Sequence, residues 1–361
     1  MFRESIVEKA KQAISDNVFP GGVVGVVRKS GDREVIPFGN YTYDQNSHLV
    51  KENSIYDTAS LTKSIPTGSL AMQLIDEGKL KLEDKLIDYI PEFNNSDRES
   101  ITVRHLLTYT LDGYGLASAV DGTDGKSLGD RGVSDLLKTL LNHNFEQRPG
   151  TIFKYSNIPA ALLGLVVERI TGHTLGDLAT ERFFRPLGMN RSTFNPSDFP
   201  LEDIVPTEIT DWRGLVHGEV HDESAYIAKR DGKVMGHAGL FSTAPDILNF
   251  LEMLLQGGTM SGEQYFSKWS INQMMTNQIA ELNDYTGLGW ELNQPRYMGD
   301  FCSPNTFGKT GFTGTLAICD IEKEVAYVIL TNRIYPKRPA DSTAINVFRK
   351  AVGEIVLKSL A

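Results

Sequence analysis

Ser60-Leu61-Thr62-Lys63 is the most informative stretch of this chain, and it is the only Ser-x-x-Lys match among the 361 residues. A serine hydroxyl is a poor nucleophile at neutral pH and needs a base within hydrogen-bonding distance. A spacing of three residues on a helix places Ser60 and Lys63 on one face, one turn apart. Burial would lower the pKa of Lys63, and the neutral amine could then accept the proton of Ser60. We therefore predict that Ser60 is a nucleophile and that Lys63 is its base.

The alternative for this tetrad is a surface helix in which Ser60 is a capping residue and Lys63 is exposed. The flanking residues Thr58, Ala59 and Ile65 are uncharged, which favours the buried arrangement. Pro66 removes a backbone donor six residues into the segment, so we expect a kink there.

A second segment, Tyr155-Ser156-Asn157, contains the only Tyr-x-Asn match in the chain. A loop tyrosine held against Lys63 could move a proton between Ser60, the leaving group and water. Asn157 could hydrogen-bond an amide of the substrate and Lys63 itself. The alternative for Tyr155 is a half-buried aromatic ring with a satisfied hydroxyl, which is the usual state of a tyrosine.

A third segment, Lys309-Thr310-Gly311, comes directly before a Gly- and Thr-rich strand edge at 312–317. Lys309 would supply a point charge for a carboxylate and Thr310 a hydroxyl donor. Gly311 would let a substrate backbone approach closely. An oxyanion needs two fixed donors, and we expect the backbone N–H groups of Ser60 and Phe312 to provide them. The alternative is a short turn before a strand.

Composition excludes several classes of partner. The chain has 36 Lys and Arg against 46 Asp and Glu, and its net charge is −10. This balance disfavours nucleic acid and anionic membranes, so we expect a small-molecule or peptide substrate. Cys302 and Cys319 are too few for a disulfide framework or a structural zinc site, and we expect free thiols, with a single bridge left open. We expect no cofactor and no metal.

The first residues, 1–9, lack the apolar core of a signal peptide, and no apolar run of about eighteen residues suits a membrane helix. We therefore expect a soluble, cytoplasmic protein as the sequence is written. If a signal peptide has been removed, the expected compartment is periplasmic or extracellular. The sequence does not indicate the oligomeric state.

The apolar periodicity predicts strands near both ends of the chain and helices between them. Predicted hairpins join 23–27 to 35–38 and 315–319 to 325–330, and predicted helices cover 3–16, 69–77, 159–171, the segment after Thr243 and 341–359. The fold class is therefore α+β, with an antiparallel sheet built from both termini, flanked by helices, and an inserted, mainly helical subdomain. We expect one catalytic unit, 1–361, with a sheet subdomain (1–57 and 233–361), a helical subdomain (58–232) and a cleft between them.

The three segments and their order in the chain resemble the motifs of the serine β-lactamase and penicillin-binding-protein superfamily. The resemblance is specifically to its class C-like branch of β-lactamases, D,D-peptidases and esterases. The resemblance covers most of the chain and includes four further phrases: Glu77-Gly78-Lys79-Leu80, Val103-Arg104-His105-Leu106-Leu107-Thr108, Pro149-Gly150 and Gly236-His237-Ala238-Gly239-Leu240-Phe241-Ser242. It implies that Ser60 is acylated, Lys63 activates it and Tyr155 is the general acid/base. Asn157, Lys309 and Thr310 would bind the substrate. The fold of the superfamily agrees with the α+β prediction.

Two departures from the superfamily pattern stand out. Leu111-Asp112-Gly113 replaces the usual Ser-Gly, so that loop is expected to be reshaped. No segment resembles the class A deacylation loop, which would leave deacylation to Tyr155 and its neighbours.

Three other segments compete with the proposed motifs. Ser96-Asp97-Arg98 nearly matches a class A Ser-Asp-Asn segment but lies in a polar turn. His237-Ala238-Gly239 could replace Lys309-Thr310-Gly311, but we prefer the latter because a strand follows it. His217 and His221 have metal-ligand spacing, yet Gly218 argues against a helix that holds both, so we expect this segment to form a lip of the cleft.

The expected activity is that of a serine hydrolase that forms an acyl-Ser60 intermediate on an amide, lactam or ester. Lys309 favours substrates with a free carboxylate, such as β-lactams or D-Ala-terminated peptides. Two alternatives remain. One is a carboxylesterase or acyltransferase on the same scaffold, and the other is a penicillin-binding sensor that acylates without turnover.

Overall fold

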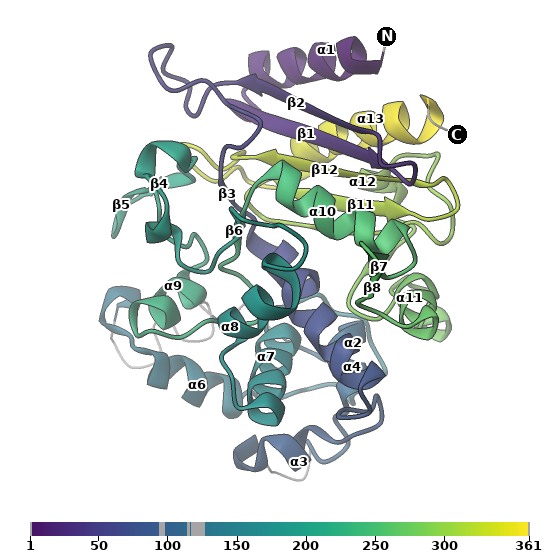
Figure 1. Ribbon diagram of the computed structural model, residues 1–361. Helices are drawn as coiled ribbons and strands as arrows, with labels where there is room; N and C mark the ends of the chain where they lie inside the picture. Colours follow the sequence, from purple (N-terminus) through teal and green to yellow (C-terminus); the bar gives the residue numbers. More distant parts are fainter. Residues whose placement is uncertain (1, 94–97, 114–115, 117–126, 360–361) are drawn as a thin grey trace.

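The computed structural model describes residues 2–93, 98–113, 116 and 127–359. Its centre is a six-stranded antiparallel sheet with the strand order β2-β1-β12-β11-β10-β9 (Figure 1). β1 (Gly21–Arg28) pairs with β12 (Val325–Thr331), so strands from the two ends of the chain are neighbours. The α+β prediction and the shared sheet are confirmed.

Both predicted hairpins are present in this sheet. β1 pairs with β2 (Arg33–Gly39), and β12 pairs with β11 (Leu316–Asp320). The remaining edge is formed by β10 (Phe307–Thr310) and β9 (Glu291–Leu292). Lys309 and Thr310 therefore end one strand, whereas the sequence had suggested that they start the next. β11 begins only at Leu316, after a turn at 311–315.

Helices cover both faces of the sheet, and the side chains of β1 alternate between two cores accordingly. Val24 and Val26 share a core with α1 (Phe2–Ser15) and α13 (Thr343–Ser359). Val23 and Val27 belong to the other core, which includes α10 (Ala244–Leu255) (Figure 1). Because both faces are buried, the sequence of β1 is a continuous apolar run in which apolar and polar residues do not alternate.

The middle of the chain forms a helical layer below the sheet in Figure 1, with α7 (Ile158–Thr171) at its centre. Pro159 lies in the first turn of α7, and Gly172 ends the helix with a left-handed φ of 72°. The helices that contact α7 are α2 (Ser69–Asp76), α3 (Leu86–Tyr89), α4 (Val103–Thr108), α6 (Val133–Leu141) and α8 (Leu175–Ala179).

Shorter elements complete the fold. The short helical segments are η1 (Ala59–Lys63), η2 (Ser64–Gly68), η3 (Pro91–Phe93), η4 (Leu128–Asp130), η5 (Thr180–Phe184), η6 (Pro196–Asp198), η7 (Leu201–Asp203) and η8 (Ala280–Leu282), and the other helices are α9 (Glu223–Arg230), α11 (Lys268–Met275) and α12 (Pro295–Met298). Three further strand pairs are β3 (Tyr56–Asp57) with β6 (Phe241–Ser242), β4 (Glu208–Thr210) with β5 (Gly214–Val216), and β7 (Thr259–Met260) with β8 (Glu263–Gln264). The β4–β5 hairpin was not predicted, because its three-residue strands are too short to show a period.

Both cysteines are free thiols, with Cys319 buried and Cys302 only partly buried. Among the described helices, none combines the length and the apolar composition needed to cross a bilayer.

Candidate active site

The Ser60 tetrad forms η1, a tight helix with three residues per turn, in which side chains three apart lie above one another. Lys63 Nζ accordingly donates a hydrogen bond to Ser60 Oγ at 2.8 Å, and Lys63 is only 1% exposed. The alternative of an exposed surface lysine is therefore wrong. The expected kink is confirmed one residue before Pro66, where Ile65 leaves the helical region with φ −118° and ψ 103°.

The environment of Lys63 makes it a weak acid that can lose its proton near neutral pH. Burial, followed by the neighbouring Lys309 cation, lowers the pKa of Lys63 to about 7, against the opposing effects of Asp222 and Glu291. Its ammonium also donates to the backbone carbonyl of His237 at 3.0 Å. A neutral amine beside Ser60 is therefore accessible near neutral pH, as a general base requires.

Tyr155 lies close to both lysines of the site. The centre of its ring is 5.3 Å from Lys63 Nζ and 4.2 Å from Lys309 Nζ, and the ring is packed against Tyr109 at 5.4 Å. The residue as a whole is 42% exposed, but loss of hydration at its hydroxyl and the carboxylate of Glu291 raise the pKa of Tyr155 well above its usual range. Its phenol is therefore protonated at neutral pH, so Tyr155 can donate a proton while Lys63 accepts one.

Lys309 is fully buried on β10, and its charge is compensated within the protein. Its Nζ donates to Glu291 Oε1 at 2.8 Å and lies 4.5 Å from the ring centre of Tyr109. Glu291 Oε2 accepts a further hydrogen bond from Tyr297 Oη at 2.5 Å. The hydroxyl-bearing neighbour Thr310, by contrast, lines the cavity next to Ser60.

Gly311 is required for the contact between β10 and the Ser60 loop. A Cβ atom at this position would lie 1.9 Å from Thr315 Oγ1 and 2.4 Å from the carbonyl oxygen of Thr58. The close approach that the glycine permits is thus to the protein's own backbone, where the sequence had suggested the backbone of a substrate. Ser60 lies in the first turn of η1, where backbone N–H groups have no partner within the helix, and within the described residues the Phe312 N–H donates to no backbone carbonyl, so both can act as oxyanion donors.

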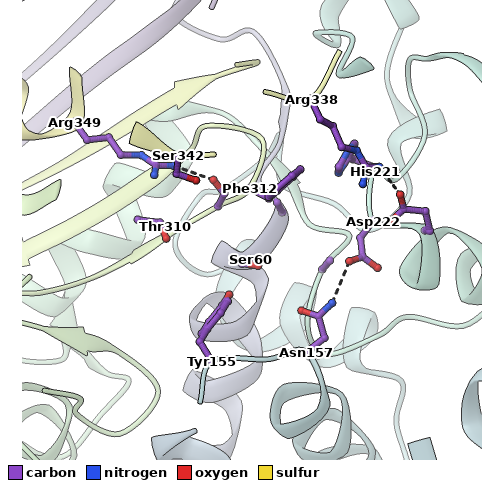
Figure 2. Close-up of a pocket in the computed structure, with 14 residues that line it drawn as sticks. Ser60, Tyr155, Asn157, His221, Asp222, Thr310, Phe312, Arg338, Ser342 and Arg349 are labelled. Atoms are coloured by element: carbon purple, nitrogen blue, oxygen red, sulfur yellow. Dashed lines mark hydrogen bonds and ion pairs between the residues drawn. The ribbon is translucent and has the colours of Figure 1, made fainter. Parts of the chain in front are cut away.

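A cavity of about 340 Å³ opens above Ser60 and contains most of the predicted site residues (Figure 2). This volume suits a small-molecule or short peptide ligand. The residues that line it are Ala59, Ser60, Tyr155, Asn157, His221, Asp222, Glu223, Ala238, Thr310, Gly311, Phe312, Arg338, Ser342 and Arg349. Lys63 and Lys309 lie behind this lining.

Asp222 was not singled out from the sequence, although it occupies one wall of the cavity. It caps α9 by accepting from the Ala225 N–H at 2.9 Å, and its Oδ1 also accepts from Ser224 Oγ at 2.6 Å. His237 Nε2 lies 3.0 Å from the same oxygen. Although burial opposes it, the His237 ring and these hydrogen bonds hold the pKa of Asp222 well below its usual range. Asn157 Nδ2 donates to the other oxygen, Oδ2, at 3.3 Å.

The competing segments also lie near the cavity. His237 is fully buried and accepts a hydrogen bond from Lys63 through its carbonyl, and its neighbour Ala238 lines the cavity, as Thr310 and Gly311 do. His221 lines the cavity as part of its lip, and His217 binds the carbonyl of Ile204 at 2.7 Å. Among the described residues, no group of three or more His, Cys, Asp or Glu side chains is arranged for a metal ion. Ser96 and Asp97 lie outside the described residues.

The comparisons with known proteins agree with this geometry. The Beta-lactamase family profile matches residues 6–351, so the chain belongs to the β-lactamase family of serine hydrolases, which includes penicillin-binding-protein-like enzymes. A protein of Escherichia coli (strain K12) named "Putative D-alanyl-D-alanine carboxypeptidase" is 31% identical over 308 residues, or 78% of this chain and 69% of that protein. A protein of the same name from Salmonella agona is 31% identical over 326 residues, or 82% of this chain and 73% of that one.

Solved structures share the fold at lower identity. "EstCE1, a hydrolase with promiscuous acyltransferase activity" superposes with a TM-score of 0.78 at 21% identity and covers 98% of both chains. Simvastatin synthase (LovD) from Aspergillus terreus gives 0.74 at 16% identity, with 98% of this chain and 97% of that chain covered. The octameric penicillin-binding-protein homologue from Pyrococcus abyssi gives 0.71 at 23% identity, with 92% of this chain and 74% of that chain covered.

Proposed function

We propose that this chain is a class C-like serine hydrolase that acylates Ser60 with substrates bearing a free carboxylate, either peptides that end in D-alanine or β-lactams. The observation that carries the proposal is the 2.8 Å hydrogen bond between Lys63 Nζ and Ser60 Oγ. The names of the curated relatives, D-alanyl-D-alanine carboxypeptidases, support the peptide substrate.

In the proposed reaction, neutral Lys63 takes the proton of Ser60 as Oγ attacks the carbonyl carbon of the substrate. The oxyanion that forms is held by the N–H groups of Ser60 and Phe312. Protonated Tyr155 donates its proton to the leaving nitrogen or oxygen and regains one through Lys63. Water then attacks the acyl-Ser60 ester, with the same residues acting in reverse, and releases the acyl group.

The substrate would lie between the two walls of the cavity. Asn157 would hydrogen-bond an amide on the acyl side, as the family resemblance implies. On the other side, the hydroxyls of Thr310 and Ser342 would donate to the carboxylate, and Gly311 keeps this strand against the Ser60 loop. Lys309 belongs to the same strand, but its ammonium is largely offset by Glu291.

Arg349 on α13 would add positive charge beside the carboxylate, because Glu291 offsets much of the charge of Lys309. It lines the cavity, donates to the carbonyls of Gly311 at 2.9 Å and Thr315 at 2.8 Å, and has no carboxylate partner among the described residues. Burial and the nearby Arg333 cation lower the pKa of Arg349 to about 9, against the opposing effects of Tyr297 and Glu291, so its charge is only partly compensated. An anionic group bound in the cavity would stabilise the charged form of Arg349.

The test is an intact-mass time course of the purified protein with a penicillin, with free drug followed in parallel and Ser60→Ala as the control. A transient adduct, or ring opening without accumulation, identifies a β-lactamase. A lasting adduct identifies a penicillin-binding enzyme or a sensor, and release of D-alanine from a D-Ala-D-Ala peptide then separates these two. An adduct that survives in Ser60→Ala would refute the assignment of the nucleophile.

A second candidate, a carboxylesterase or acyltransferase, is favoured by one observation. The Lys309–Glu291 ion pair removes the net charge that a carboxylate-binding strand would otherwise present. If the penicillin is neither bound nor consumed while a neutral p-nitrophenyl ester acylates Ser60, this second candidate replaces the first.

A further inference from the structure

The cavity carries two opposite charges that have no ionised carboxylate, lysine or arginine as a partner. Figure 2 shows them on opposite sides of Ser60: Arg349 lies with Thr310 and Ser342, and Asp222 lies with Asn157. The other charged lining residues are in ion pairs: Arg338 contacts Glu223 and Glu208, and Glu208, which lies outside the lining, is also 2.9 Å from His221 Nε2. The cavity is therefore bipolar, with the nucleophile between its poles.

Asp222 keeps a hydrogen-bonding position that faces the cavity. Its Oδ1 is occupied by the α9 cap, by Ser224 and by His237, whereas Oδ2 has only the 3.3 Å contact with Asn157 among the described residues. Its side chain is 22% exposed, although it lines a wall that is otherwise well packed. A carboxylate oxygen accepts more than one hydrogen bond, so Oδ2 can bind a donor from a ligand.

The histidine beside Asp222 binds only one of its two carboxylate oxygens. His237 is fully buried, and its Nε2 lies 3.0 Å from Asp222 Oδ1 and 2.9 Å from Ser224 Oγ. Asp222 Oδ2 therefore stays open to a donor from a ligand.

We propose that Asp222 selects substrates whose acyl group carries a cationic amine, such as an N-terminal D-amino acid residue or a diamino-acid side chain. This inference rests on the proposed function, since Asn157 marks the acyl side of Ser60. The ammonium would donate to Asp222 Oδ2, while the carboxylate on the leaving side faces Arg349. The preferred substrate is thus a short zwitterionic peptide.

Three penicillins that differ at one carbon of the acyl side chain test this selection. Benzylpenicillin has two hydrogens there, ampicillin an amine and carbenicillin a second carboxylate, while the carboxylate of the ring system is common to all three. The rate of Ser60 acylation in the wild-type protein should fall in the order ampicillin, benzylpenicillin, carbenicillin. Ampicillin should acylate Ser60 about ten- to a hundredfold faster than carbenicillin, as expected of a hydrogen bond between charged groups.

Asp222→Asn and Glu223→Gln form a matched pair of variants. Asp222→Asn should lower the ratio of ampicillin to carbenicillin acylation by about tenfold or more, whereas Glu223→Gln, which removes a paired carboxylate of the same cavity, should leave the ratio unchanged. Equal losses of this ratio in both variants would overturn the inference. The inference would also be overturned if the wild-type protein showed no preference for ampicillin over carbenicillin. This second measurement does not require Asp222→Asn to fold.

Failure of the proposed function gives a different result. If no penicillin acylates Ser60, the p-nitrophenyl esters of D-alanine and N-acetyl-D-alanine report the same preference on substrates without a carboxylate. A preference for the free amine that is lost in Asp222→Asn would support the inference while the carboxylate part of the proposed function fails. If no probe labels Ser60, both are refuted.

Discussion

The buried ion pair between Lys309 and Glu291 gives the most direct test of the electrostatics of this site. The two charged atoms are 2.8 Å apart, and the side chains are 0% and 8% exposed. We consider Lys309→Met, Glu291→Gln and the double variant, which keep approximately the volume of each side chain. Each single variant leaves one buried charge without its partner.

The cost of each single variant is limited by the ease with which the remaining group becomes neutral. In Lys309→Met, Glu291 can take up a proton; from its ordinary pKa of 4.5 to pH 7 this costs about 3.4 kcal/mol. In Glu291→Gln, Lys309 can lose its proton; from 10.5 to pH 7 this costs about 4.8 kcal/mol. Both limits agree with the roughly 3–5 kcal/mol measured when one partner of a buried pair is removed. The double variant should recover most of the loss, because no charge remains buried.

Urea unfolding of the four proteins at pH 7 measures this coupling, which should be at least about 2 kcal/mol. The loss in Lys309→Met should also shrink as the pH falls toward 4.5, since Glu291 is then protonated in the unfolded chain as well. Additive single losses below about 1 kcal/mol would refute the buried pair. The double variant separately tests substrate binding by Lys309: its rates with penicillin and with a neutral ester should fall equally if the lysine serves the site mainly through this pair.

Three further predictions concern the reacting groups. The stopped-flow rate of Ser60 acylation by a neutral p-nitrophenyl ester should rise with pH through about 7, because Lys63 must be neutral. Asp222→Asn should move this rise to lower pH, since Asp222 raises the pKa of Lys63. Tyr155→Phe should slow turnover by about 10²–10⁴-fold without preventing labelling of Ser60 by a fluorophosphonate, which intact mass will detect. Gly311→Ala should lower stability by at least about 1–3 kcal/mol in urea unfolding and reduce acylation, because its Cβ would overlap the Thr58 carbonyl. A normal acylation rate in Gly311→Ala would contradict the assigned contact.

The sequence predicted the parts of the fold whose apolar pattern repeats over several residues. α1, α7, α10, α13 and both hairpins were expected close to their observed bounds, because each buries a periodic face in one of two cores. The three motif segments were found because their residue types are rare in combination. Their meeting around one cavity depends on strand pairing that only the structure gives.

The sequence did not predict the roles of residues that act through a neighbour in space. Glu291 lies on a two-residue strand, and no motif links it to Lys309, eighteen residues later in the chain. Asp222 belongs to the segment that was expected to form a lip of the cleft, but no role was predicted for its carboxylate, and none was predicted for Arg349 on the last helix. A charged residue predicted to lie inside an apolar strand or helix face would have been the available signal, because buried charges need partners.

The position of Ser60 itself depends on a conformation that no local sequence rule favours. Ala59 has a left-handed φ of 48°, which costs a non-glycine residue about 1–3 kcal/mol. One local contact holds this backbone, because Ala59 N–H donates to Asp57 Oδ1 at 2.8 Å. Two distant segments add to it: Thr315 Oγ1 donates to the Thr58 carbonyl at 2.9 Å, and Thr58 Oγ1 donates to the Leu240 carbonyl at 2.7 Å. The turn after Gly311 and the segment after His237 thus hold the same loop from two sides. Because these two segments also position the Phe312 N–H and Lys63, the nucleophile, its base and the second oxyanion donor are fixed by one set of contacts, and a change in any of them should disturb all three groups together.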